Sequence, residues 1–448
     1  MAKSHVAALV LALAAGSVMA QQPTAMQWET AALAGSYKEN ISEDEKIAGL
    51  SKFWSEVKYN FIDTATLQRL DWDKLYLEYL PRVRATRSTE EYYRVLMEMV
   101  SRLKDGHTNV YPPDELNDRM WARPLMKTVP IEGRVLVTEV LDPGLRAKGI
   151  MPGLEVVAVE GTDVKTYAAR ELAPYMSAST PQDEELRTFG SFFLSGAAGT
   201  APRVTFRDAA GRQFEQPVPR VGAEVRKAAW TKPPSFEFST LPDNVAYVAL
   251  NSFNDNSAAD AYLAAFDEIA KSAALIIDLR ENGGGNSDVG YKVLATLDNK
   301  PFLTSRWATR DYKPSWRAWK KEMPMYAEAP DVVQADAQRQ YGKPVIVLTS
   351  AGTYSAAEDF AVAFDGMQRG TLVGEATGGS TGQPLFIKLP GGGAARICTK
   401  QDTYPDGRLF VGVGVQPEKV VRRTVDGIRA GRDEVLEAAL ALLQAKLQ

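Results

Sequence analysis

Apolar residues recur at intervals of three and four in the first quarter of the chain, the spacing of one face of an α-helix. The first run is Ile47, Leu50, Trp54, Val57 and Phe61, and a later one is Tyr92, Leu96, Met99 and Leu103. Each run follows a Ser-x-x-Glu sequence, Ser42 with Glu45 and Ser88 with Glu91. Because this is the signature of a capping box, we expect a helix to begin at each serine.

The same region predicts another helix and the position of a histidine. The helix is expected to start near Asp71 and to stop at Pro81. Gly106 stands where the last helix would end in a left-handed residue. We therefore expect His107 to emerge just beyond a helix end, and we assign residues 21–128 to an N-terminal helical domain.

The pattern changes to short strands with apolar residues at every second position from about residue 129 to 220. Val135 and Val137, then residues 155–160, then residues 203–206 ahead of Gly211 fit this period. These residues predict a β-rich domain over 129–220.

After a proline-rich joint at residues 232–234, apolar strands alternate with helical segments. Strands are expected over 245–250, 274–279 and 343–348, and helices over 258–271, 286–297 and 355–367. This alternation predicts an α/β core with parallel strands over residues 221–448.

An aromatic-rich insertion interrupts this core at residues 305–341. It carries Trp307, Tyr312, Trp316, Trp319 and Tyr326 among many charges, without a clear period. Such a segment is either a lid or binding loop or a plain surface excursion.

The first twenty residues read as a secretory signal peptide: a short start with Lys3, an apolar stretch from Val6 to Ala15, and small residues before Gln21. The alternative, a membrane anchor, is disfavoured because the run is shorter than the roughly 20 residues that span a bilayer. We expect cleavage after Ala20, a periplasmic or secreted protein, and no membrane span after cleavage. His5 would be lost, which leaves His107 as the sole imidazole.

Composition narrows the classes of function. The formal net charge is −4, and no basic run with interleaved aromatics is present, which argues against nucleic acid as a partner. The single cysteine, Cys398, excludes an intramolecular disulfide and is expected to be a buried apolar residue. A zinc site of clustered histidines is disfavoured, and no metal or cofactor is implied.

Two segments could carry chemistry. Residues 349–358 follow an apolar strand and open a helix, so the Ser355 hydroxyl should face the helix N-terminus at the carboxyl edge of the sheet. That suits a nucleophile, although a serine there is also a common helix N-cap. Residues 280–285 end in three glycines, where the amides of Gly284 and Ala356 could form an oxyanion hole. The alternatives for these glycines are a tight turn and a phosphate-binding loop. The second is less well supported, because the Lys-Ser/Thr pair of a P-loop is missing.

In combination, several motifs resemble the C-terminal-processing and tricorn-core serine peptidases. They are LIIDLRENGGG at 275–285, VIVLTSAGTYSAAEDF at 345–360, TLVGEATGGSTGQ at 371–383 and VGVGVQPE at 411–418. The segment LKDGHTNV at 103–110 is similar to the tricorn-like branch, and residues 137–164 resemble a PDZ domain. The resemblance spans nearly the whole chain after residue 20.

The resemblance implies a crotonase/ClpP-like α/β catalytic core, a PDZ-like module and a peptide or protein substrate. It implies that Ser355 is the nucleophile, with Gly284 and Ala356 as oxyanion donors. Ser380 stands where the Ser-Lys branch has its lysine, so the base falls on His107, as in the tricorn-like branch. The rate is expected to fall on acidification through an apparent pKa within about one unit of the ordinary histidine value of about 6.5, depending on the surroundings of the ring.

The sequence departs from the tricorn-like pattern at two places. Gly106 replaces the serine before the histidine, and residues 411–413 lack the tail glutamate. The group that orients His107 is left open; candidates by motif proximity are Asp105, Glu358, Glu375 and Gln383.

The function stays open among three classes at this point. The leading hypothesis is a peptidase, and the alternatives are a non-enzymatic binder of an apolar ligand or peptide on the same scaffold and a hydrolase of small esters or amides. Neither the substrate sequence nor the oligomeric state follows from these residues.

Overall fold

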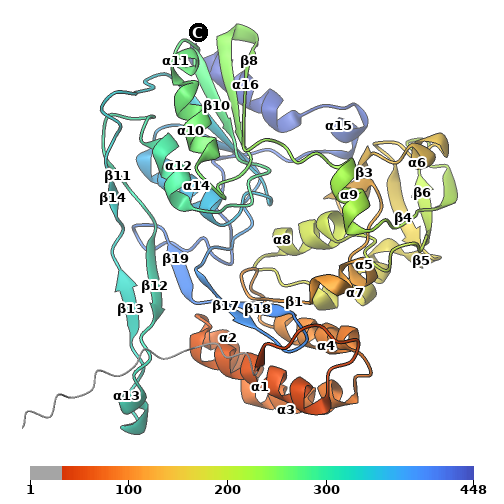
Figure 1. The fold of residues 1–448 in the computed structure, drawn as a ribbon. Coiled ribbons are helices and arrows are strands. Elements are labelled where there is room, and N and C mark those ends of the chain that lie inside the picture. Colours follow the sequence, from red (N-terminus) through yellow and green to blue (C-terminus); the bar gives the residue numbers. More distant parts are fainter. Residues whose placement is uncertain (1–32, 448) are drawn as a thin grey trace, which may run out of the picture.

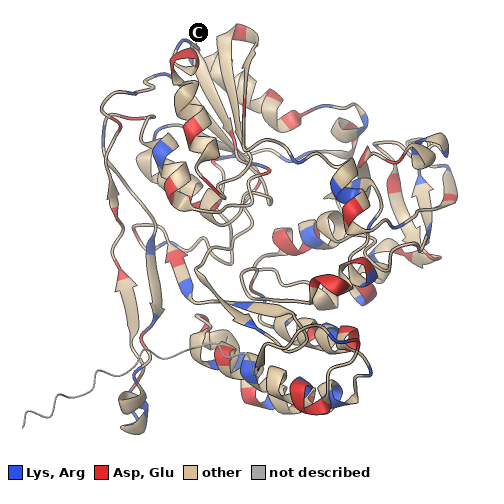
Figure 2. Cartoon of the chain, in the orientation of Figure 1, with Lys and Arg blue, Asp and Glu red and all other residues tan. Residues whose placement is uncertain are grey.

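The computed structural model describes residues 33–447, so the expected signal peptide lies outside the described residues. The chain is a mixed α/β multidomain protein with a helical N-terminal part and several sheets (Figure 1). Acidic and basic residues are interspersed along the elements in view (Figure 2). Among the described residues, no helix is both long and apolar enough to cross a membrane.

Four helices form the N-terminal part: α1 (Glu43–Asn60), α2 (Thr64–Leu70), α3 (Trp72–Ala85) and α4 (Thr89–Ser101). Their apolar faces share one core, which contains the two predicted apolar stripes. The capping box at Ser42 and Glu45 is confirmed in both directions. At the second site Ser88 accepts the Glu91 N–H, but the Glu91 carboxylate accepts the N–H of Arg87 instead.

Two boundary predictions in this part are wrong. Helix α3 continues through Pro81 to Ala85. The carbonyl that loses its N–H donor to Pro81 belongs to Leu77, a residue that is 64% exposed, so the helix face at this point is not buried. Helix α4 ends at Ser101, and the left-handed residue after it is Lys104 with φ 52°, not Gly106. His107 therefore lies in a loop after the helix and before β1 (Asn109–Tyr111).

The β-rich segment contains one antiparallel sheet in the order β2-β3-β4-β6-β7, with β5 (Thr162–Asp163) beside β4. The strands are β2 (Met126–Ile131), β3 (Arg134–Val140), β4 (Glu155–Val159), β6 (Arg203–Arg207) and β7 (Gln213–Pro217). The period-two pattern thus predicted β3, β4 and β6, whose inward side chains share one core with α7 (Val164–Glu171).

The α/β core is built on a six-stranded sheet in the order β20-β16-β15-β10-β9-β8. The strands are β8 (Phe236–Leu241), β9 (Val245–Leu250), β10 (Ala274–Asp278), β15 (Val345–Thr349), β16 (Thr371–Gly374) and β20 (Lys419–Val420). All neighbours are parallel except β8 and β9. The prediction of a core with parallel strands is therefore confirmed.

Alternate residues of the buried strands pack on opposite faces of this sheet, as the pleat requires. One face packs on α10 (Ser257–Ala264), α11 (Phe266–Ile269), α12 (Ser287–Leu294) and α14 (Ala356–Met367). The other face packs on α16 (Glu434–Leu447). The sheet is thus covered on both sides, and the carboxyl ends of β10 and β15 lie side by side.

Two further features connect the parts. A small sheet pairs β1 with β18 (Ala394–Cys398) and β18 with β17 (Pro384–Lys388), so strands of the C-terminal half complete the core of the helical part. Cys398 is a free, buried member of that core, as predicted. The aromatic insertion forms an arm of β12 (Arg306–Arg310), α13 (Pro314–Ala318) and β13 (Met325–Glu328), which projects away from the core (Figure 1).

Candidate active site

Ser355 lies at the junction between β15 and α14, as the sequence predicts. It occupies the N-cap position of α14 with φ 56° and ψ −126°, outside the conformations that a residue with a side chain usually adopts. Backbone strain of this kind persists only where the surrounding structure holds it, and it concentrates at functional sites. The turn aims the Ser355 hydroxyl at a residue far away in the sequence.

That residue is His107. Its Nε2 lies 3.2 Å from Ser355 Oγ, across 248 positions of sequence. Its Nδ1 lies 2.8 Å from Ser380 Oγ, and the Tyr354 ring stacks on the imidazole at 5.1 Å between centroids. When the neutral ring carries its proton on Nδ1, it donates to Ser380 and accepts the Ser355 proton at Nε2.

The environment of His107 keeps the imidazole neutral. The residue is only 4% exposed. Burial lowers the pKa of His107 to about 3, and the positive charges of Arg396, Arg187 and Lys400 act in the same direction. The prediction of an acid limb within about one unit of pH 6.5 allowed the surroundings a smaller effect than this burial has.

Ser380 was not among the candidates for orienting His107. Asp105 accepts the backbone N–H of His107 at 3.4 Å, and its carboxylate is bonded to Thr108 and Ser179. Glu375 and Gln383 line the surrounding cavity. The sequence did mark position 380, as the place where a lysine is missing, but nothing in the motif indicated that a serine hydroxyl there contacts an imidazole.

Glu358, the remaining candidate, holds the loops around the site. Its buried carboxylate accepts hydrogen bonds from the N–H groups of Ser355, Gly379 and Ser380 and from the Thr377 hydroxyl, at up to 3.1 Å. Burial raises the pKa of Glu358 to about 8, against the opposing effect of these donors. The side chain therefore fixes Ser355 and Ser380 relative to each other without touching the imidazole.

The predicted oxyanion donors lie beside Ser355. Gly284 has φ 95°, and a Cβ there would come within 2.6 Å of Ser355 Cβ and 2.9 Å of the Ala356 nitrogen. A glycine is therefore required for this approach. Among the described residues no acceptor receives the Ala356 N–H, whereas the Gly284 N–H donates to Asn282 Oδ1 at 2.9 Å. One donor is available, and the other is engaged by a side chain.

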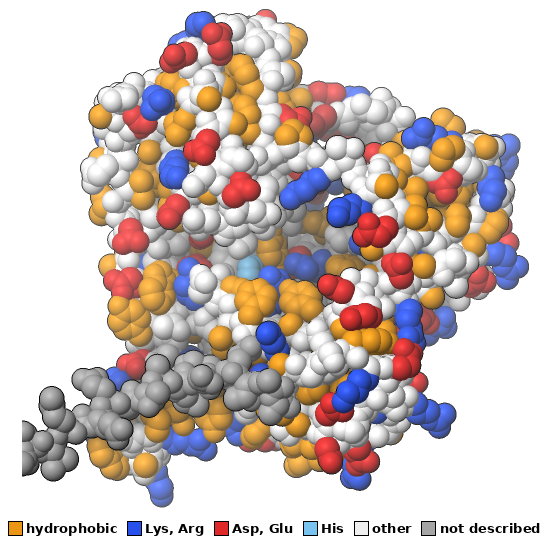
Figure 3. All heavy atoms as spheres, in the orientation of Figure 1, with side chains coloured by type: hydrophobic (Ala, Val, Ile, Leu, Met, Phe, Trp, Pro, Cys, Tyr) orange, Lys and Arg blue, Asp and Glu red, His pale blue; other side chains and the backbone are white. Residues whose placement is uncertain are grey.

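His107 and Ser355 line a cavity of about 880 Å³ between the three parts of the chain. Its walls include His107, Ser355, Arg187, Phe192 and Arg396. Figure 3 shows the described histidine at the floor of a hollow that is bordered by basic and apolar side chains. Within residues 33–447 no cluster of three His, Cys, Asp or Glu residues is placed to hold a metal ion.

Comparison with known proteins identifies the family. Residues 244–421, which contain the parallel sheet and Ser355, match peptidase family S41. The chain contains an S41 peptidase domain. Residues 48–101 of this S41 peptidase match the tricorn protease C1 domain, which corresponds to α1–α4. The protein is therefore a hydrolase, and the resemblance seen in the sequence motifs is confirmed.

Curated relatives extend the S41 match over most of the chain. A carboxyl-terminal-processing protease of Synechocystis is 24% identical over 423 residues, covering 90% of this chain and 87% of the relative. A chloroplastic C-terminal processing peptidase of Tetradesmus obliquus is also 24% identical, covering 82% and 75%.

Solved structures share the fold of this S41 peptidase. Mature CPAF complexed with lactacystin superposes with a TM-score of 0.71 at 15% identity, covering 90% of this chain and 99% of that one. The photosystem II D1 C-terminal processing protease gives 0.50 at 22% identity, covering 84% and 93%.

Proposed function

We propose that this S41 peptidase cleaves peptide bonds through an acyl-enzyme on Ser355, with His107 as general base. The observation that carries the proposal is the single line of contacts from Ser355 Oγ to His107 Nε2 and from His107 Nδ1 to Ser380 Oγ. A serine hydroxyl needs an adjacent base to attack a carbonyl at neutral pH, and the neutral imidazole is that base.

The steps follow from these contacts. Ser355 Oγ attacks the substrate carbonyl while its proton passes to His107 Nε2. The imidazolium then returns the proton to the leaving amine, and a water molecule hydrolyses the ester by the same route. Ser380 orients the ring through Nδ1.

In this proposal the Ala356 N–H stabilises the oxyanion together with Gly284. The Gly284 N–H shares its proton between Asn282 Oδ1 and the oxyanion, or turns from one to the other. Loss of one such donor typically costs about 100- to 1000-fold in rate.

We further propose that residues 129–220 form a PDZ-like module and that the parallel sheet is a crotonase/ClpP-like core. The antiparallel order β2-β3-β4-β6-β7 and the alternation of parallel strands with α10, α12 and α14 support this division. A periplasmic or secreted location, after cleavage at Ala20, is proposed on the signal-like sequence of residues 1–20.

A peptide library with quenched fluorophores tests the reaction. The wild-type protein should cleave members of the library, and mass spectrometry should show hydrolysed peptide bonds. Ser355→Ala should lose this turnover while keeping its unfolding temperature. Turnover of esters alone would favour the small-ester hydrolase, and no turnover by folded protein would favour the binder.

A further inference from the structure

A second cavity adjoins the candidate active site. Its volume is about 520 Å³, within the range of ligand pockets, and it lies where α5 (Asn117–Met120), α9 (Ala223–Ala229) and the loop after β1 meet. Arg187, Phe192 and Arg396 line both cavities. One extended chain can therefore occupy the two together.

The lining of this second cavity is strongly cationic. Four arginines face it, Arg123, Arg187, Arg226 and Arg396, against one carboxylate, that of Asp114. Asp114 accepts a hydrogen bond from Asn117 at 3.1 Å. The rest of the wall is largely aromatic and apolar and includes Tyr111, Trp121, Tyr175 and Phe192.

Two of the four arginines already have partners that fix them. Arg187 forms an ion pair of 2.6 Å with the buried carboxylate of Asp183. Arg396 donates to Asn109 Oδ1 at 2.7 Å and to the Gly106 carbonyl at 2.9 Å. Both side chains are therefore held in the cavity wall by these partners.

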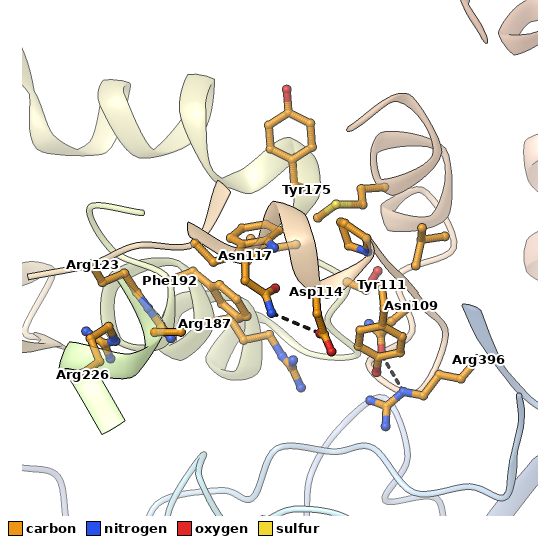
Figure 4. Close-up of a pocket in the computed structure, with 17 residues that line it drawn as sticks. Asn109, Tyr111, Asp114, Asn117, Arg123, Tyr175, Arg187, Phe192, Arg226 and Arg396 are labelled. Carbon is orange, nitrogen blue, oxygen red and sulfur yellow. Dashed lines mark hydrogen bonds between the residues drawn. The ribbon is translucent and has the colours of Figure 1, made fainter. Parts of the chain in front are cut away.

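Arg123 and Arg226 differ from that pair. Figure 4 shows them side by side at one end of the cavity, with Tyr111 and Arg396 at the other end. In the part of the chain that the structure describes, neither forms an ion pair; each donates to a backbone carbonyl, Arg123 to Ser191 and Arg226 to Pro124. The Nε of Arg123 is buried with no hydrogen-bond partner.

Two adjacent guanidinium groups without a counter-ion are costly. Burial lowers the pKa of Arg123 to about 10, and the charge of Arg226 adds to this effect. An anion between the two guanidinium groups would neutralise the repulsion. The guanidinium fork matches the two oxygens of a carboxylate.

We infer that Arg123 and Arg226 form a subsite that binds a carboxylate of the substrate chain, next to an apolar side chain held by Trp121, Tyr175 and Phe192. The inference rests on the proposed peptidase function, because it places the substrate across both cavities. The carboxylate comes either from an Asp or Glu side chain or from a chain terminus, and these two sources share the same chemistry.

Binding to Ser355→Ala tests the subsite without catalysis. The probe is a short fluorescein-labelled peptide of alanine and leucine, made with a C-terminal carboxylate or amide and with an internal Glu or Gln. Fluorescence anisotropy should give a Kd about tenfold lower for a peptide with the recognised carboxylate than for its neutral analogue. If the C-terminal carboxylate gives the tenfold lower Kd, the subsite binds a chain terminus; if the internal Glu gives it, the subsite binds an acidic side chain.

The arginine variants complete the test. Arg123→Gln and Arg226→Gln, each made in Ser355→Ala, should remove the advantage of the carboxylate, so that the carboxylate peptide and its neutral analogue bind with equal Kd. Arg212→Gln, at a side chain that is 80% exposed in the β-rich segment, is the matched control and should keep it. Raising the salt concentration should weaken the binding of the carboxylate peptide to Ser355→Ala more than that of the neutral peptide. This measurement does not depend on how the arginine variants fold.

Equal Kd values for all peptides, or no binding of the carboxylate forms up to millimolar concentration, would overturn the subsite. That result would leave the proposed function intact if the wild type still cleaves peptides. Conversely, carboxylate discrimination by a protein that never hydrolyses a peptide would support the subsite and contradict the peptidase proposal.

Discussion

At the residue scale, the distinctive feature is that a hydroxyl, and not a carboxylate, contacts the Nδ1 of His107. A carboxylate at this position would stabilise the imidazolium and raise its pKa, whereas Ser380 is neutral. Burial and the nearby cations Arg396 and Arg187 both oppose protonation. The ring therefore stays neutral over a wider range of pH than an ordinary histidine.

The pH dependence of activity follows from this. A base whose pKa is lowered is active above that pKa and loses activity only as the pH falls through it. Since the pKa of His107 is lowered to about 3, kcat/KM should show no loss attributable to this base between pH 5 and pH 7. Measurement of kcat/KM across this range, with far-UV circular dichroism to confirm folding, checks the expectation. An acid limb with a midpoint near 6.5 in folded protein would contradict it.

Ser380 itself should act as a positioning residue. Ser380→Ala leaves the His107 Nδ1 without its contact, and the imidazole then samples other orientations. We expect kcat to fall about 10- to 100-fold with little change in KM, because a loss of orientation affects the reacting groups more than binding. Steady-state kinetics on a cleaved peptide measure both parameters.

A second buried serine is the control for Ser380. Ser272 lies between Ile269 and Tyr341, to which its hydroxyl is bonded, and does not line the active-site cavity. Ser272→Ala should therefore lower stability without changing kcat. Equal kinetic losses in the two variants would show that Ser380 is only structural.

At the element scale, Gly106 determines how closely the histidine loop approaches α14. A Cβ on Gly106 would overlap the Tyr354 hydroxyl and lie 3.0 Å from an Asp183 oxygen. Gly106→Ala should therefore displace the loop and lower kcat/KM by about 100-fold, the typical cost of a shift of about 1 Å at a reacting group. Kinetics and thermal unfolding of the variant measure the two effects.

Gly366, within α14 itself, is the matched control. No atom lies within 4 Å of a Cβ built there, and its backbone is helical. Gly366→Ala should stabilise the protein by about 0.5–1 kcal/mol and leave the kinetics unchanged. If Gly106→Ala were as active as Gly366→Ala, the close approach would not matter.

The sequence predicted those helices and strands well whose apolar residues follow a clear local pattern. Apolar strands β9, β10 and β15 and the start of α14 follow from period and length. Pro81 misled the prediction, because an exposed helix face tolerates a missing N–H that a buried face would not. Lys104 takes the left-handed conformation that a glycine usually adopts, and sequence alone gives no sign of this choice.

Some parts of the candidate site could likewise be predicted from local sequence, and others could not. The Ser355 turn and the three glycines are local motifs, and the lone imidazole left few alternatives for a base. The contact of Ser380 with His107 spans 273 positions and depends on the packing of separate parts, so no spacing could indicate it. The engagement of Gly284 by Asn282 is equally a matter of loop geometry.

At the scale of the whole molecule, the three parts of the chain meet at the site. Ser179, Thr180 and Gln182, from the β-rich segment, bond to Gly106, Gly378 and Thr377 respectively. Arg187 of the same segment lines both cavities. The β-rich segment is therefore part of the wall of the candidate active site.

Deleting residues 129–220 should consequently abolish peptide hydrolysis rather than merely change its preference. The deletion removes Arg187 and the Ser179 hydroxyl, which accepts the Gly106 N–H of the histidine loop. It also removes Thr180 and Gln182, which donate to backbone carbonyls of the core. Activity of the truncated protein, with circular dichroism to show that the parallel sheet remains, measures this. Parental turnover by a folded truncated protein would mean that the segment is only a spacer.

The proposed reaction depends on activation of Ser355 by His107. Labelling with a fluorophosphonate probe, followed by mass spectrometry of the digested protein, tests it most directly. We expect one adduct, on Ser355, which is absent in Ser355→Ala and forms far more slowly in His107→Ala at neutral pH, because an unactivated hydroxyl is a poor nucleophile. An adduct on another residue, or labelling of His107→Ala at the parental rate, would contradict it.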